Sequence, residues 1–152
     1  MTVRPAQPSE AAELMRVINA AFKPAEAFFV EGDRISLAQV RAHFATGVFL
    51  AMDDLSGCVY VELRGERAYF GLLSVDPARQ GAGAGKRLIA AAEDYARKRG
   101  CRFMDIHVVN LRTELPPFYR ALGYVETGTE EFHGEDAPTK LPCHFLLMTK
   151  PL

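Results

Sequence analysis

The chain has 152 residues, enough for one domain whose core buries roughly 68–70% of the unfolded surface, and we expect a single domain over residues 1–152. Its 18 basic and 19 acidic residues are interspersed and give a net charge of −1, so no long-range field gathers nucleic acid or an acidic membrane surface, and we expect neither partner. No basic segment leads into an apolar one at the start, and no apolar run reaches the roughly 18 residues that span a bilayer, so we expect a cytoplasmic protein.

The three cysteines predict neither a disulfide nor a metal site. Cys58, Cys101 and Cys143 lie far apart, form no C-x-x-C pair, and each borders or enters an apolar run. An odd number of scattered cysteines is typical of buried apolar positions in a reducing compartment. We therefore expect no bound metal.

The first third of the chain predicts a short strand, two helices and a loop between the helices. Residues 2–4 are the strand candidate, and Ser9 is positioned to cap a helix whose apolar side ends at Phe22. Residues 23–36 combine a proline, a glycine, adjacent phenylalanines and several charges, a composition typical of a binding loop. The second helix is predicted over residues 36–45.

The middle and end of the chain predict a mixed sheet. Residues 48–52, 58–63 and 68–75 are apolar strands joined by tight turns, which is the pattern of an antiparallel meander. A loop and a helix follow before the next strand, residues 103–109, and a helical crossover implies that this strand runs parallel to the third strand of the meander. Two such neighbours can splay apart and leave a cleft. Residues 144–149 supply a last strand.

The connection between those two parallel strands is the most informative stretch. Residues 72–86 are an apolar run, then a loop with glycines at positions 81, 83 and 85, then the start of an amphipathic helix that Gly100 is positioned to end. First-turn N–H groups have no intrahelical partner, and the helix macrodipole adds roughly half a positive charge there. Glycines let a diphosphate approach this backbone because no Cβ stands in the way. We therefore predict an anion-binding loop.

The glycine spacing disfavours two common nucleotide sites. A P-loop needs four residues between its first glycine and Gly-Lys, followed by Ser or Thr, whereas three residues separate Gly81 from Gly85-Lys86 and Arg87 follows. A dinucleotide-binding fold needs G-x-G-x-x-G with an acidic residue at the end of the next strand, whereas these glycines run G-x-G-x-G and Asp105 lies inside that strand.

The loop does resemble motif A of the GCN5-related N-acetyltransferase (GNAT) superfamily, which is Gln or Arg, two residues, Gly, one residue, then Gly or Ala. Gln80, Gly83 and Gly85 match in register, and Val75-Asp76-Pro77 precedes them as Val-x-Pro does in many members. The resemblance implies that the anion is the pyrophosphate of acetyl-coenzyme A (acetyl-CoA) and that pantetheine lies in the cleft as a pseudo-strand. The residues it assigns to the coenzyme are Leu73, Val75, Gln80, Gly81, Gly83, Ala84, Gly85 and Lys86.

A second match lies after the parallel strand. Phe118-Tyr119-x-x-x-Gly123-Tyr124 resembles motif B of the same superfamily, and Asn110 matches its frequent asparagine, another coenzyme contact. Tyr119 follows Asn110 by nine residues where seven is more usual, with Pro116-Pro117 in the insertion, so the helix is predicted to begin near these prolines. The two matches together imply a GNAT-like α/β (α+β) domain with a mostly antiparallel sheet of six to seven strands and about four helices.

The resemblance also implies the activity, an N-acetyltransferase that moves acetyl from acetyl-CoA to a primary amine of a small molecule or protein by direct attack. Tyr119 is the expected catalytic acid toward the thioester sulfur, and a backbone N–H near Ser74 is the expected oxyanion donor. Glu62 is the expected general base, with Tyr69, Glu31 and His107 as rivals, and some relatives use a water chain instead.

Several alternatives stay open from the sequence. Phe28, Phe29 and Glu31 lie in the segment that lines the acceptor site in relatives, but the two phenylalanines suit a role in pinning the loop to the core equally well. Glu31 and Glu130 suit a cationic amine. An exposed edge strand pairs two copies in many relatives, so a homodimer is an expectation. A non-catalytic acyl-CoA-binding sensor or interaction module is the alternative function.

Overall fold

The computed structural model describes residues 2–132 and 139–152. In these residues seven strands form one sheet in the order β1-β2-β3-β4-β5-β7-β6, in which β4 and β5 are the single parallel pair. The strands are β1 (Val3–Pro5), β2 (Val48–Met52), β3 (Gly57–Arg64), β4 (Arg67–Val75), β5 (Phe103–Val109), β6 (Val125–Glu131) and β7 (His144–Pro151). The described α-helices are α1 (Ala11–Glu26), α2 (Leu37–Thr46), α3 (Ala84–Lys98) and α4 (Leu115–Ala121). The predicted fold class is confirmed.

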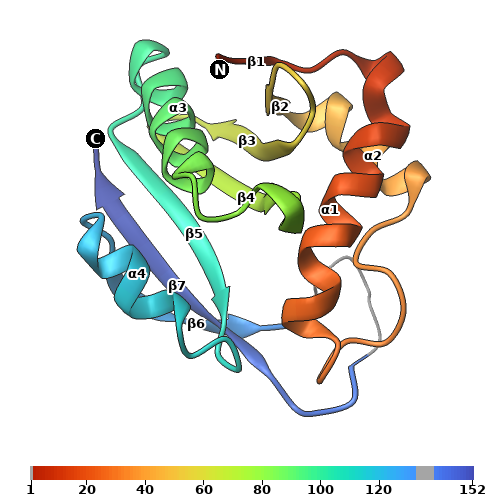
Figure 1. The fold of residues 1–152 in the computed structure, drawn as a ribbon. Coiled ribbons are helices and arrows are strands. Elements are labelled where there is room, and N and C mark those ends of the chain that lie inside the picture. Colours follow the sequence, from red (N-terminus) through yellow and green to blue (C-terminus); the bar gives the residue numbers. More distant parts are fainter. Residues whose placement is uncertain (1, 133–138) are drawn as a thin grey trace.

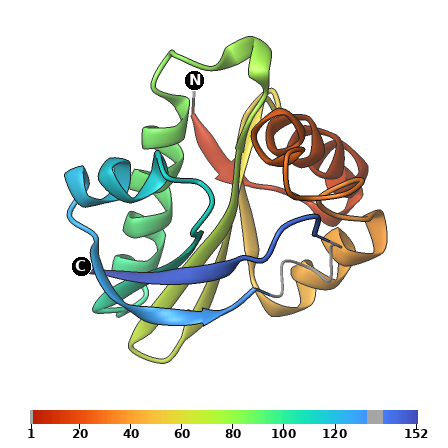
Figure 2. The ribbon, with the colours of Figure 1, turned by 90° about the horizontal axis from the view of Figure 1, so that it is seen from below.

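Helices cover both faces of the sheet (Figures 1 and 2). The apolar stripe of α3, with Leu88 and Ala92, packs with Phe70 of β4 and Ile106 of β5 on one face, which we call the α3 face. Leu14, Val17 and Ile18 of α1 pack with Phe49, Tyr60 and Leu72 on the other face, the α1 face. Because strand side chains alternate between faces, each strand residue in the cleft region belongs to one of these two sides.

The parallel pair separates soon after it forms. β4 and β5 pair at three positions, from Arg67 opposite Phe103 to Tyr69 opposite Asp105. Beyond that point β4 stays paired with β3, and β5 stays paired with β7 along its whole length. The sheet therefore divides in its middle beyond Tyr69. Figure 1 shows β4 and β5 diverging toward their C-terminal ends.

A bidentate ion pair closes the base of the division. The Arg67 guanidinium donates to both oxygens of Asp105 at 2.7 and 2.8 Å, and the Thr149 hydroxyl donates to the same carboxylate at 2.6 Å. These groups join β4, β5 and β7. Burial alone would raise the pKa of Asp105, but the hydrogen bonds from Arg67 and Thr149 hold it below its usual range.

The second helix begins close to where the sequence predicts, whereas the first helix ends later than predicted. Ser36 caps α2, accepting from the Gln39 N–H while the Gln39 side chain accepts from the Ser36 N–H. The first helix is longer than predicted, because α1 continues through Pro24 to Glu26 and ends with the Ala27 N–H bonded to the Lys23 carbonyl. A proline this near the end removes one hydrogen bond without stopping the last turn. No helix in the described ranges has the length and apolar character needed to cross a membrane.

Candidate active site

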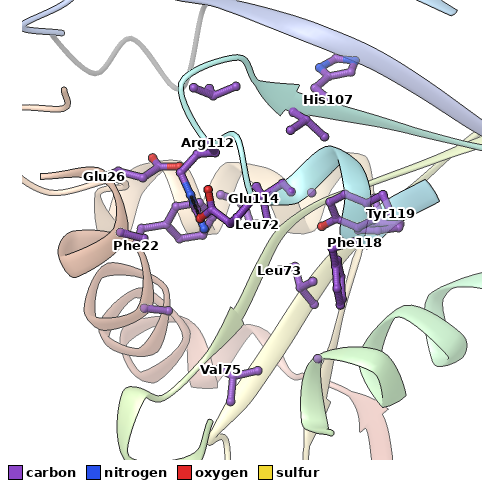
Figure 3. Close-up of a pocket in the computed structure, with 18 of the residues that line it drawn as sticks. Phe22, Glu26, Leu72, Leu73, Val75, His107, Arg112, Glu114, Phe118 and Tyr119 are labelled. Carbon is purple, nitrogen blue, oxygen red and sulfur yellow. Dashed lines mark hydrogen bonds and ion pairs between the residues drawn. The ribbon is translucent and has the colours of Figure 1, made fainter. Parts of the chain in front are cut away.

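A cavity of about 1010 Å³ occupies the division of the sheet. At one end it is lined by the glycine loop and the start of α3, in its middle by β4, β5 and α4, and at the other end by the last turns of α1, by Phe132 after β6 and by Phe145 of β7. Figure 3 shows this space from the side of α1 and the glycine loop, with the strand residues Leu73 and Val75 facing it.

The glycine loop has the geometry of an anion site. Gly81 and Gly83 have φ of +91° and +78°, a region that disfavours any residue with a Cβ, and Gly83 is the N-cap of α3. The first hydrogen bond of α3 runs from the Arg87 N–H to the Gly83 carbonyl at 3.1 Å, so the N–H groups of residues 84–86 have no intrahelical partner. A Cβ built on Gly85 meets nothing within 4 Å. The predicted strand, turn and helix are thus present, with the helix beginning at Ala84.

Polar contacts hold this loop against the end of β4. The Gln80 side-chain amide donates to the Val75 carbonyl at 3.1 Å, and the Asp76 carboxylate accepts from the Ala78 N–H at 3.0 Å. Lys86 also lines the cavity. All eight loop and strand residues that the motif assigns to the coenzyme, from Leu73 to Lys86, therefore border one space.

β4 carries a bulge at the level of the division. Opposite β3, Gly71 pairs with Tyr60 but Ser74 pairs with Cys58, so β4 has one extra residue. Leu72 takes φ +54°, a left-handed conformation that costs a leucine roughly 1–2 kcal/mol, and the Ser74 hydroxyl donates to its carbonyl at 2.9 Å. Strain of this kind on a cavity wall points to a function, because the bulge turns backbone groups of residues 72–74 away from the regular ladder.

Tyr119 projects from α4 into the middle of the cavity. The residue is 7% exposed, and its ring packs against Phe70, Phe118 and Tyr124 with centroid separations of 5.2 to 6.2 Å. Burial raises the pKa of the Tyr119 phenol to about 12; the Arg112 charge opposes the rise, and Tyr69 adds to it. The hydroxyl is therefore protonated at neutral pH. Figure 3 shows it directed toward the interior of the cavity.

The far end of the cavity holds a charge cluster that the sequence did not reveal. Glu26 of α1 is 6% exposed and accepts from Arg112 at 3.0 Å, and Arg112 also donates to Glu114 at 2.9 Å. Burial raises the pKa of Glu26 although the Arg34 and Arg112 charges act against it. The two partners are 86 residues apart, and α1 was predicted to end before Glu26, so no local pattern indicated the pair.

Two aromatic residues line the same cavity from the α1 face. Tyr69 of β4 and His107 of β5 have ring centroids 4.9 Å apart, and His107 also lies 5.2 Å from the Phe145 ring. Ile106 and Val108 belong to the core on the α3 face, so His107 between them must point to the other side. Figure 3 shows His107 and Tyr119 on opposite sides of β5.

Other predicted residues lie outside the cavity lining. The Asn110 carboxamide oxygen accepts from the His144 N–H at 2.8 Å and so ties β5 to β7. Glu62 accepts from the Tyr60 hydroxyl and from Arg64; burial raises its pKa, but these two hydrogen bonds outweigh burial and the pKa is lowered. Neither residue borders the space that Tyr119 and the glycine loop share.

The aromatic loop residues divide between core and surface. Phe29 is fully buried beside Val109 and Phe145, which is the pinning role, and Phe28 is 53% exposed. Glu31 is exposed, and like the two phenylalanines it does not border the cavity.

A divided parallel pair, with a glycine loop at the start of the crossover helix, is the arrangement of the acetyltransferases to which the sequence motifs pointed. The sequence profile of the acetyltransferase (GNAT) family matches residues 12–124, which is most of the chain. The chain belongs to this family.

Solved structures agree on the fold. The PaiA N-acetyltransferase of Thermoplasma acidophilum in complex with coenzyme A superposes with a TM-score of 0.77 at 16% identity, over 100% of both chains. YncA of Salmonella typhimurium, solved with its cofactor acetyl-CoA, gives 0.73 at 20% identity over 100% of this chain and 94% of that one. The ribosomal-protein-S18-alanine N-acetyltransferase of Escherichia coli gives 0.74 at 15% identity over 99% and 92%. A search of curated protein sequences gives no significant match.

Proposed function

We propose that this protein is an acetyl-CoA-dependent N-acetyltransferase that transfers the acetyl group to a primary amine of a small molecule or protein by direct attack. The observation that carries the proposal is the continuity of the cavity. One space joins a glycine loop suited to a diphosphate, a strained strand edge, a buried tyrosine and a chamber at the end of α1.

The coenzyme would lie along β4. Its diphosphate fits the loop because Gly81, Gly83 and Gly85 leave open space there and the N–H groups of residues 84–86 have no intrahelical partner. The pantetheine arm would run past Val75 and Leu73 toward Tyr119, with its amides bonded to the β4 backbone. Coenzyme A complexes of GNAT-fold proteins such as PaiA support this ligand.

Tyr119 would act on the leaving sulfur. A free thiol has a pKa near 8.5, so a phenol with a pKa of about 12 is the weaker acid. Tyr119 would therefore stabilise the departing thiolate chiefly as a hydrogen-bond donor, and the thiolate would take up a proton from solvent. A backbone N–H of the bulge, among residues 72–74, would donate to the carbonyl oxygen as negative charge develops there.

The test of this proposal has two stages. Thermal unfolding is measured with acetyl-CoA, coenzyme A, ATP and NAD at matched concentration; ligand at 100 times its Kd stabilises by about 2.7 kcal/mol, which is roughly 5–10 °C for a domain of this size. Thiol release from acetyl-CoA is then followed with a panel of alkylamines, arylalkylamines, amino acids and peptides with a free N-terminus.

The two stages distinguish an acetyltransferase from a protein that binds another ligand and from one that binds coenzyme A without catalysis. A shift with ATP or NAD alone would mean that the glycine loop binds another ligand. A shift with the coenzyme A species without turnover of any amine would favour a non-catalytic coenzyme A-binding module.

A further inference from the structure

We propose that His107 is the general base of the acetyl transfer, and that Tyr69 and Glu130 connect it to the amine and to solvent respectively. This inference rests on the proposed function, because it concerns the amine that would attack in the same cavity. It places the base on the α1 face of β5, beside the division, whereas Glu62 is on the same face of β3, one strand further away, and does not border the cavity.

His107 lies at the level where the reaction would occur. The last paired residues of the parallel strands are Tyr69 and Asp105. Two residues further along, Gly71 and His107 are the next positions on that face, and the Leu72 bulge follows at once. His107 is therefore at the base of the division, on the side opposite Tyr119. An amine that enters from the α1 end meets this histidine before it meets the thioester.

Tyr69 contacts His107, and its hydroxyl lies next to the bulge. A Cβ built on Gly71 would lie 2.2 Å from the Tyr69 hydroxyl, so this hydroxyl lies directly over the Gly71 backbone. The ring is in contact with His107 and is covered by the Arg64 guanidinium at 4.9 Å. A hydroxyl that both donates and accepts can pass a proton from the amine to the imidazole.

Glu130 of β6 gives the imidazole an exit to solvent. Its Oε2 lies 3.8 Å from His107 Nε2, and its side chain is 46% exposed whereas that of His107 is 19% exposed. A carboxylate at this distance favours the protonated imidazole, and a water can bridge the two groups. An imidazole is the side chain best suited to accept and release protons near neutral pH.

In the proposed transfer one bond forms and one bond breaks. The amine nitrogen forms a bond to the thioester carbonyl carbon, and the carbon–sulfur bond breaks. The proton that the nitrogen loses passes to His107, directly or through the Tyr69 hydroxyl, and leaves along Glu130. The thiolate departs hydrogen-bonded to Tyr119 and takes up one proton from solvent, which balances the proton released through Glu130, so the amine and acetyl-CoA give the amide and coenzyme A.

The other carboxylates near the cavity are less suited to the role. Glu26 and Glu114 both accept hydrogen bonds from Arg112, whose positive charge opposes protonation of either carboxylate, and this group lies at the far end of the cavity. Asp105, two residues before His107 on the same face, is held by Arg67 and Thr149. Of the acidic groups described around His107, Glu130 is the one within ion-pair distance.

The experiment is a pH profile of kcat/KM for His107→Phe and His107→Gln, using the panel amine that the wild type acetylates fastest. Phenylalanine keeps the stacking on Tyr69 and Phe145, and glutamine keeps polarity, so a loss in both variants reports the missing base. We expect kcat/KM at pH 7 to fall by about 10²–10⁴-fold and to go on rising with pH, while the thermal shift with acetyl-CoA is kept. His144→Gln, at an exposed β7 residue, is the matched control and should keep the wild-type profile.

Glu130→Gln provides a second, opposite readout. Removal of the negative charge lowers the pKa of the imidazole, so the acidic limb should move to lower pH, and the plateau should fall because the proton loses its route to solvent. A structural role of His107 would not produce this shift.

Two outcomes would overturn the assignment. If both His107 variants keep the wild-type profile, or if the acidic limb is lost in Glu26→Gln instead, His107 is not the base while the acetyltransferase activity stands. If the wild type shows neither an acetyl-CoA shift nor turnover of any amine, the proposed function fails and this inference fails with it.

Discussion

Replacement of Gly85 by alanine should separate coenzyme binding from stability, because the two effects have opposite signs. Gly85 is in the first turn of α3, its φ is not positive, and a Cβ there meets no atom within 4 Å. Alanine is favoured over glycine in a helix by up to about 1 kcal/mol, so the unliganded variant should melt up to roughly 2–4 °C higher than the wild type.

The same methyl group would stand in the cavity, against the helix N-terminus where the diphosphate is proposed to bind. A diphosphate that contacts backbone N–H groups cannot keep that distance over a Cβ. We expect the thermal shift with 1 mM coenzyme A to fall to less than half of the wild-type shift, an experiment that needs no acceptor amine.

Gly100→Ala is the matched control. Gly100 follows the other end of α3 at φ +87°, so alanine is strained there by roughly 1–2 kcal/mol, yet the site is remote from the cavity. This variant should melt lower but keep the full coenzyme A shift. A Gly85→Ala variant that binds coenzyme A as tightly as the wild type would refute the diphosphate assignment.

Two further substitutions test single side chains. Tyr119→Phe should lower kcat by about 10²–10³-fold, the effect of losing one donor to developing charge, while the coenzyme A thermal shift stays unchanged; equal turnover would refute its role. Lys150→Met should destabilise by about 3 kcal/mol, because the buried Glu93 carboxylate loses both 3.0 Å contacts to the ammonium, and the melting temperature should fall by roughly 6–12 °C. Adding Glu93→Gln removes the uncompensated charge, keeps an acceptor for the Tyr124 hydroxyl, and should restore most of the loss; a double variant as unstable as the single one would contradict this account.

The elements that sequence predicted well are those with local causes. The N-cap of α2 needs only Ser36 and Gln39, and the glycine loop needs only its own glycines and the apolar run before it. Strand β5 is found at its predicted limits because an apolar run bounded by turn signals has few other ways to be buried. These features depend on residues within about ten positions of one another.

The far end of the cavity was not predictable in the same way, because it is assembled from distant segments. Glu62 shares a face with its cross-strand partner Tyr69, but it lies on β3, one strand away from the division, which only the order of the strands decides. The Glu26–Arg112 pair depended on α1 continuing past Pro24, where the usual expectation is that a proline ends a helix. The bulge at Leu72 left no signal, since leucine is an unfavourable choice for a positive φ.

The division of the sheet explains why acid and base would lie on different faces. A continuous parallel ladder between β4 and β5 would add hydrogen bonds worth about 0.5–1.5 kcal/mol each. These hydrogen bonds are missing beyond Tyr69, and the Arg67–Asp105 ion pair joins the two strands before that point. The opening is a passage through the sheet, with Tyr119 on the α3 face and His107 on the α1 face. An amine from one side and the coenzyme from the other would therefore meet at the bulge, with the amine beside His107 and the leaving thiolate beside Tyr119.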